Sequence, residues 1–348
     1  MKGSAGGGRG LRARLAVGLA GLVALAGGVA GAAWTARAES PAAPAGLTRE
    51  VRLRVGHIAT ANSLYQQDAE DFKRLVEQRS GGRIRVDVFC CGQLGRQREL
   101  VEQVQLGTLE MVVSSSEMVG IVPEFAVWDL PFLFDSREEI QRAVEGPFGA
   151  ALFRYLEPKG MVGLGFWENG FRVMTNNQRP IRRPEDLRGL KMRVPPNPDR
   201  VRMFRLWGAN AGPLDFSELF SALQTGVFDG QENPLAQIVS ARLYEVQKFL
   251  SVTGHVYTPT YLVASRRWWE RLEPAARQLL RETAVEVGRN SRQRGVQWDR
   301  DGLNVVQRAG VQVNKDVDKE AFRRLSGPLY DDFTSKYGRE LLNLAQAH

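Results

Sequence analysis

The sequence predicts an α/β protein built from two lobes. Between Val51 and Val113, stretches with the alternation of strands are separated by two stretches with helical periodicity. This order of strand, helix, strand, helix, strand is typical of an open parallel sheet. A second series of such elements follows between Met161 and Asp229. Without its first 38 residues the chain still has roughly 310, more than one hydrophobic core usually organises, so we expect one lobe from each series.

The first 38 residues have the pattern of a Sec-type signal peptide. Basic residues come first, then an uncharged stretch rich in Ala, Gly, Leu and Val over 15–33, and then the small-x-small site Ala36-Arg37-Ala38. We expect cleavage after Ala38, an exported product, and a linker over 39–50. A retained membrane anchor is the alternative, but the apolar stretch is barely long enough to span a bilayer.

The charge pattern argues against a nucleic-acid partner. The formal charge is +8, but residues 1–38 carry five Lys or Arg and no Asp or Glu, so removing them leaves +3. The remaining cationic residues are scattered among acidic ones, which is typical of a solvated surface.

The two cysteines, Cys90 and Cys91, are adjacent in the sequence. Neighbouring Cα atoms lie about 3.8 Å apart, below the usual separation for an unstrained disulfide. A conventional cross-link is therefore excluded, whereas two free thiols or a vicinal disulfide ring both remain open.

The first series of elements is predicted in order from Val51. Residues 51–55 alternate as a strand, and the amphipathic run 64–78 predicts a helix that Asn62 or Ser63 can cap. A strand over 84–88, a helix over 98–106 and a short strand over 109–113 follow. Ligands of such sheets sit at the carboxyl ends of the strands, which places the loops 56–63 and 114–116 at the expected site.

The second series leads to a long C-terminal helix. We expect strands over 161–166, 172–175, 191–194 and 227–229, and helices over 200–207 and 217–225, each helix followed directly by a glycine. The helix expected from Pro274 to about Ala309 would be about 50 Å long, enough to lie across both lobes.

Motifs of metal, cofactor and hydrolase chemistry are missing from the sequence. His57, His255 and His348 lie far apart and lack neighbours at metal-ligand spacing, so no metal is expected. Gly163-x-Gly165 lacks the third glycine of a dinucleotide loop, and there is no phosphate-binding loop or Gly-x-Ser-x-Gly elbow. We therefore expect no cofactor and no catalytic residues, and a secreted enzyme is the least favoured function.

Three segments of the second series carry a family resemblance: Asn169-Gly170-Phe171-Arg172, Asp186-Leu187-Arg188-Gly189-Leu190-Lys191-Met192-Arg193-Val194-Pro195, and Leu223 to Pro234 (LQTGVFDGQENP). Further matches are Gly92-Gln93-Leu94-Gly95, Leu130-Pro131-Phe132-Leu133-Phe134, Gly208-Ala209-Asn210 and Tyr244-Glu245-Val246-Gln247-Lys248. In this order the segments closely resemble the solute-binding proteins of TRAP (tripartite ATP-independent periplasmic) transporters, the DctP-type family.

The resemblance implies a two-lobed periplasmic-binding-protein-like fold, in which each lobe is an open mixed sheet flanked by helices and a long helix spans both. We expect lobe I to comprise residues 51–170 and 259–298, and lobe II residues 171–258 and 299–345. The implied function is capture of a small organic carboxylate, such as a C4-dicarboxylate, in the periplasm and delivery to membrane permease subunits. The alternatives are a receptor for a solute without a carboxylate and a receptor that feeds a sensor.

The resemblance also implies the ligand-binding residues. Arg193 matches the family arginine that grips the ligand carboxylate, and a guanidinium can do so with two parallel hydrogen bonds. Arg172 matches a second arginine at this carboxylate and Asn233 an amide donor. Phe216, Asn62 and Ser115 complete the predicted set. Glu232 is expected to orient its neighbours, because like charges repel.

Overall fold

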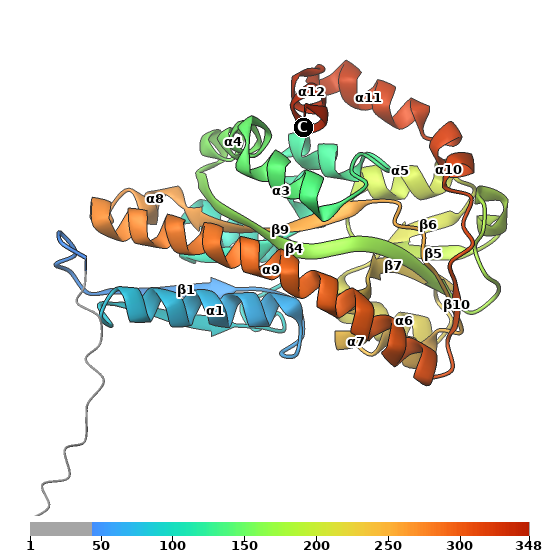
Figure 1. Ribbon diagram of the computed structural model, residues 1–348, viewed down its shortest axis with the longest axis horizontal. Helices are drawn as coiled ribbons and strands as arrows, with labels where there is room; N and C mark the ends of the chain where they lie inside the picture. Colours follow the sequence, from blue (N-terminus) through green and yellow to red (C-terminus); the bar gives the residue numbers. More distant parts are fainter. Residues whose placement is uncertain (1–43, 348) are drawn as a thin grey trace, which may run out of the picture. The chain divides into compact units, whose positions relative to one another are not determined.

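Strand β4 (Met161–Asn176) and helix α9 (Pro274–Arg308) run side by side through the centre of the described part of the protein (Figure 1). A computed structural model describes residues 44–347, so the expected signal peptide and its cleavage site lie outside the described residues. The long helix covers nearly the predicted range, and Pro274 is its first residue, where a missing N–H is tolerated.

The other strands are β1 (Val51–Gly56), β2 (Ile84–Phe89), β3 (Met111–Ser114), β5 (Lys191–Val194), β6 (Asn210–Pro213), β7 (Gly230–Pro234), β8 (Phe249–Ser251), β9 (Tyr257–Ser265) and β10 (Gln312–Asn314). The other α-helices are α1 (Leu64–Arg79), α2 (Gln97–Leu106), α3 (Arg137–Glu145), α4 (Pro147–Arg154), α5 (Pro198–Leu206), α6 (Leu219–Gln224), α7 (Leu235–Ser240), α8 (Arg266–Trp269), α10 (Lys319–Leu325), α11 (Gly327–Tyr337) and α12 (Glu340–Gln346). Three 3₁₀ helices bear on the site: η1 (Ser116–Gly120), η2 (Pro123–Asp129) and η5 (Phe216–Glu218).

The strands form a mixed sheet in the order β2-β1-β3-β9-β4-β7-β5-β6. The predicted parallel pairing is present at one end, where β1 pairs with β2 and β3, and again at the other, where β5 pairs with β6 and β7. Between them, β9 and β4 are antiparallel to their neighbours. The mixed sheet, the flanking helices and the long α9 agree with the predicted fold class.

Each half of this sheet has hydrophobic clusters on both faces. Along β3, Met111 and Val113 belong to the cluster under α1 and α9, while Val112 between them belongs to the cluster under α2 and η2. This alternation follows from the two-residue period of a strand. Two further clusters surround β5 and β7 in the other half.

Three predicted strands differ from the structure. The stretches 161–166 and 172–175 belong to one strand, β4, whose middle is polar and carries irregular pairing at Gly163/Gly165 and Glu168/Gly170. The strand predicted over 227–229 begins three residues later, as β7. Its residues, Gly-Gln-Glu-Asn-Pro, are all buried although none is hydrophobic, so hydrophobic alternation cannot reveal them.

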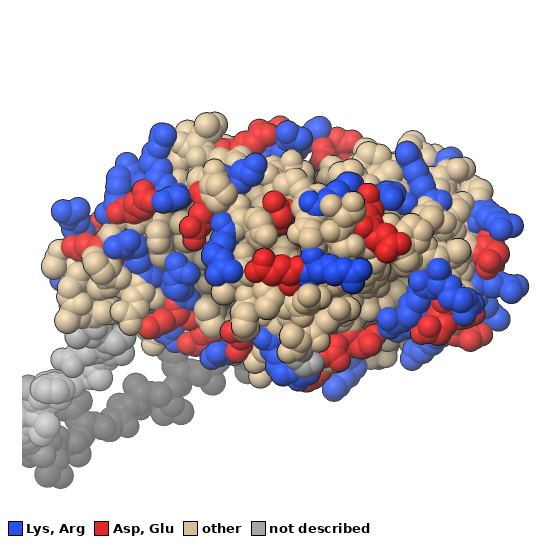
Figure 2. All heavy atoms as spheres, turned by 90° about the horizontal axis from the view of Figure 1, so that it is seen from above, with Lys and Arg blue, Asp and Glu red and all other residues tan. Residues whose placement is uncertain are grey.

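The surface carries charges of both signs. On the face shown in Figure 2, Lys and Arg are interspersed with Asp and Glu, as the sequence pattern predicts. None of the described helices is both long and apolar enough to cross a membrane. The described residues also contain no group of three or more His, Cys, Asp or Glu that could hold a metal ion.

Candidate functional site

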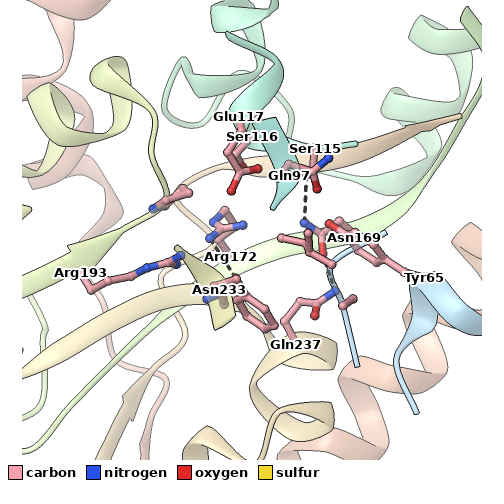
Figure 3. A pocket seen from close by; sticks show the side chains of 14 residues that line it. Tyr65, Gln97, Ser115, Ser116, Glu117, Asn169, Arg172, Arg193, Asn233 and Gln237 are labelled. Carbon is pink, nitrogen blue, oxygen red and sulfur yellow. Dashed lines mark hydrogen bonds between the residues drawn. The ribbon is translucent and has the colours of Figure 1, made fainter. Parts of the chain in front are cut away.

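A small cavity lies at the ends of strands from both halves of the sheet (Figure 3). Loops after β1 and β3 and the starts of α1 and α2 form one wall, and β4, β5, β7, η5 and α7 supply the rest. Its lining comprises Ile58, Ala59, Tyr65, Gln97, Ser115, Ser116, Glu117, Asn169, Arg172, Arg193, Pro195, Phe216, Asn233 and Gln237.

Five of the six predicted ligand-binding residues line this cavity: Arg193, Arg172, Asn233, Phe216 and Ser115. They come from positions up to 118 residues apart in the chain and are brought together by the fold. Asn62 is exposed and is not among the lining residues, so its role in binding remains a prediction.

Arg172 is buried and held by neighbours on β7. Its guanidinium donates from Nε and Nη2 to the Glu232 carboxylate, and Nη2 also donates to Asn233 Oδ1 at 3.1 Å. The Asn233 amide in turn donates to Gln231 Oε1 at 2.5 Å. Asn233 thus helps to position Arg172, and the predicted contact of its amide with the ligand stays a prediction.

Glu232 is the centre of a buried ionic network. Its carboxylate accepts hydrogen bonds from Arg172 and from Arg200 Nη1, the latter at 2.8 Å, and lies 3.2 Å from His255 Nε2. Arg200 also forms an ion pair with Asp129 of η2. Burial opposes ionisation of Glu232, but the two arginines outweigh it and hold the pKa of this carboxyl well below its usual range. As the sequence predicted, Glu232 orients its neighbours.

Arg193 is equally buried but has no carboxylate partner among the described residues. Only 1 % of it is exposed, and its Nε and Nη2 donate to the Leu214 carbonyl at 2.9 and 2.6 Å. Burial lowers its pKa to about 10, although Glu117 and Glu232 oppose this shift from a distance. Figure 3 shows the guanidinium pointing into the cavity toward Arg172. A desolvated cation without an anion is unfavourable, so an anion in this cavity would stabilise Arg193.

The opposite part of the cavity is polar and holds residues that the sequence analysis did not select. Asn169 Nδ2 donates to Ser115 Oγ at 3.4 Å, and Gln237 Nε2 donates to Asn169 Oδ1 at 3.3 Å. Both amide atoms of Gln97 are buried without a hydrogen-bond partner in the described chain, as is Gln237 Oε1. Asn169 lies inside a motif already recognised, while the two glutamines carry no signal in the sequence.

Glu117 is the one acidic residue among the lining residues, and within residues 44–347 its carboxylate has no hydrogen-bond or ion-pair partner other than its own backbone N–H. Burial raises its pKa, although Arg193 and Arg172 act against this. Glu117 directly follows the predicted loop 114–116. Its position just after a strand was therefore the feature of the sequence that could have marked it as a site residue.

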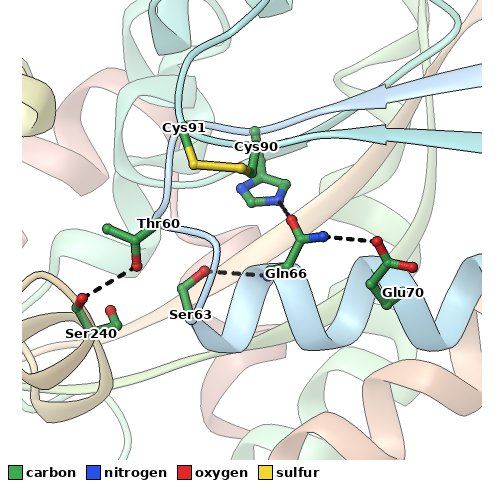
Figure 4. The surroundings of a disulfide bond; sticks show 8 residues. Thr60, Ser63, Gln66, Glu70, Cys90, Cys91 and Ser240 are labelled. Carbon is green, nitrogen blue, oxygen red and sulfur yellow. Dashed lines mark hydrogen bonds between the residues drawn. A yellow bond between two sulfur atoms is a disulfide. The ribbon is translucent and has the colours of Figure 1, made fainter.

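Cys90 and Cys91 form a vicinal disulfide (Figure 4). The Cys91 N–H donates to the Ala59 carbonyl at 3.0 Å, and Cys91 has a positive φ of 61°. Of the two alternatives that the sequence left open, the structure shows the ring, and it is hydrogen-bonded to a residue that lines the cavity.

Comparison with known proteins agrees with this geometry. The profile of the bacterial extracellular solute-binding proteins, family 7 (DctP), matches residues 55–336. A solute-binding protein of Verminephrobacter eiseniae is 38% identical over 82% of this chain and 86% of its own length. The 2,3-diketo-L-gulonate-binding periplasmic protein YiaO of Escherichia coli is 34% identical over 78% of this chain and 83% of its own.

A solved relative has the same fold. The TRAP periplasmic solute-binding protein of Polaromonas, bound to D-erythronate, superposes with a TM-score of 0.83 at 37% identity and covers 86% of this chain and 99% of its own. The chain therefore belongs to the bacterial extracellular solute-binding proteins of family 7, the solute receptors of TRAP transporters.

Proposed function

We propose that this protein captures a small organic acid anion through its carboxylate, which Arg193 and Arg172 bind. The observation that carries the proposal is the burial of Arg193 without a counterion in the described chain. Its Nε–H and one N–H of Nη2 donate to the Leu214 carbonyl. One N–H of Nη1 and the second N–H of Nη2 therefore remain for two parallel hydrogen bonds to a carboxylate.

The relatives support this ligand class. D-Erythronate and 2,3-diketo-L-gulonate, which two of them bind by name, are both organic acids with one carboxylate. A receptor for an uncharged solute would leave the Arg193 charge buried and unpaired.

The proposal extends to location and delivery. As in the family, we place the mature protein in the periplasm, where it hands the bound acid to membrane permease subunits without chemical turnover. We also propose that residues 51–170 with 259–298 and residues 171–258 with 299–345 move as two lobes. The lining of the cavity from both sets of residues supports this division.

Calorimetric titration of organic acids, and of their amides, into Arg193→Ala and Arg193→Lys tests the proposal. Each charge-assisted hydrogen bond is worth about 1.5–3 kcal/mol, so Arg193→Ala should weaken binding by at least tenfold. Lysine should not restore it, since it lacks the planar fork. Arg188→Ala, an exposed arginine outside the cavity, is the control. Unchanged affinity in both Arg193 variants, or equal affinity for an acid and its amide, would refute the proposal.

A further inference from the structure

We propose that Glu117 makes this cavity selective for hydroxylated acids with a single carboxylate and disfavours the binding of dicarboxylates. This inference rests on the proposed function and narrows its ligand class. It arises from an acidic residue placed inside a site for anions.

Glu117 has no evident structural task. It is half-buried on η1, and apart from its own backbone N–H its carboxylate has no hydrogen-bond or ion-pair partner within the described residues. Figure 3 shows it projecting into the cavity opposite the arginines. Every other buried acid that surrounds the site is paired: Glu232 with Arg172 and Arg200, and Asp129 with Arg200. The free oxygens of Glu117 are therefore available to the ligand.

An ionised carboxylate only accepts hydrogen bonds, so it selects for donors. On an organic acid held by Arg193, the donors within reach are hydroxyl groups along the carbon chain. A second carboxylate at this place would be repelled by the like charge of Glu117, and it would also lose its hydration on entering the cavity. Glu117 thus favours a hydroxyl and disfavours a second acid group.

The remaining polar lining fits the same ligand. Gln97 and Gln237 are 3 % and 4 % exposed, and three of their four amide atoms have no partner in the part of the chain that the structure describes. Buried amides of this kind need hydrogen bonds, and an amide supplies both donors and acceptors, as a hydroxylated chain requires. Among the lining residues Arg172 and Arg193 are the only cations, and they sit together. A second carboxylate would find no cation of its own.

A competing explanation is that Glu117 serves as a distant counterion for Arg193 in the empty protein. In that case its removal would increase the affinity for every acid by a similar factor. Selectivity by hydrogen bonding predicts opposite changes for hydroxy acids and for dicarboxylates, which separates the two explanations.

The test is calorimetric titration at pH 8 of wild type, Glu117→Gln and the control Glu124→Gln, an acid outside the cavity lining. The ligands are matched pairs that differ in one terminal group: erythronate with tartrate, and gluconate with glucarate. Succinate serves as the acid without hydroxyls. Thermal melts of each variant check that it is folded.

Of erythronate and gluconate, one will bind wild type more tightly. We expect its affinity to be at least tenfold higher than that of the dicarboxylate of the same pair and than that of succinate. Glu117→Gln should reduce this ratio at least tenfold, and Glu124→Gln should leave it unchanged. A ratio within twofold of wild type in Glu117→Gln, or an equal gain for all acids, overturns the inference while the proposed function stands. Failure of wild type to bind any organic acid would overturn the proposed function itself.

Discussion

Three arginines are almost completely buried around one carboxylate, and they differ in what they stabilise. Arg200 is fully buried between Asp129 and Glu232, and Arg172 is bound to Glu232. Arg193 donates to a carbonyl group alone. Removing one member of a buried ion pair leaves an uncompensated charge, whereas removing an unpaired charge does not. We therefore expect Arg200 and Arg172 to stabilise the fold, although Arg172 also faces the proposed carboxylate site, and Arg193 to act mainly in binding.

We predict that Arg200→Met lowers the free energy of unfolding of the ligand-free protein by about 3–5 kcal/mol, since Asp129 and Glu232 lose their shared cation. Arg193→Met should lower it much less, because no carboxylate loses a partner and one carbonyl loses two hydrogen bonds. Denaturant unfolding without ligand measures both. Equal losses in the two variants would show that Arg193 is structural.

The sequence identified the arginines of the site but not the polar residues around them. Arg172 and Arg193 lie in motifs that occur together in one family, and five of six predicted residues line the cavity. Glu117, Gln97 and Gln237 were missed because their significance depends on having no partner. A missing partner is a property of the folded structure, and residue types and spacing do not reveal it.

At the scale of single elements, α9 owes its close fit to glycines. Gly288 and Gly295 are seven residues apart and face β4. A Cβ on Gly288 would overlap the carbonyl oxygen of Phe166, and one on Gly295 would lie 2.6 Å from Glu168 Cγ. Close approach of backbone to backbone is one of the uses of glycine. The helix that crosses both halves of the sheet can therefore lie directly on their common strand.

We predict that Gly288→Ala destabilises the protein by about 1–3 kcal/mol or more, because the carbonyl of Phe166 belongs to a strand and cannot move freely. Thermal and denaturant unfolding measure the effect. Gly327→Ala at the start of α11 is the control, since no atom lies within 4 Å of its Cβ position. It should be neutral or slightly stabilising. A neutral Gly288→Ala would mean that α9 and β4 can separate at little cost.

The elements that the sequence predicted well are those whose burial is hydrophobic. β1, α1 and β2 begin and end within a residue of the predicted ranges, and their buried residues are mostly apolar, with Asp68, which pairs with Arg294 of α9, as the charged exception. The middle of β4 and all of β7 are buried through ion pairs and amide contacts instead. Periodicity of hydrophobic residues carries no information on such strands, which are the ones that bear Arg172 and Asn233.

At the scale of the whole molecule, contacts across the cavity connect its two walls. Asn197 Nδ2 donates to the Ser116 carbonyl at 3.1 Å and to Asp129 Oδ2 at 2.6 Å. Nearer the surface, Arg96 pairs with Asp215 at 2.8 Å and with Glu218 at 3.0 Å. Arg96 precedes Gln97, and Asp215 precedes Phe216, both of which line the cavity. If the lobes move as proposed, these ion pairs exist only while the walls are together, so we expect them to favour the closed form.

We predict that Arg96→Ala speeds ligand release by about two- to thirtyfold, because it removes two exposed ion pairs that each contribute about 0.2–1 kcal/mol to the closed form. The effect should shrink as salt is raised, since exposed charges are screened. Stopped-flow displacement of a bound acid at low and high salt measures it. Arg98→Ala is the control, because Arg98 pairs with Glu102 within α2, does not line the cavity and makes no ion pair across it. If Arg96→Ala and Arg98→Ala release ligand at the same rate, closure depends on the ligand and on buried contacts such as that of Asn197, and the surface ion pairs are incidental.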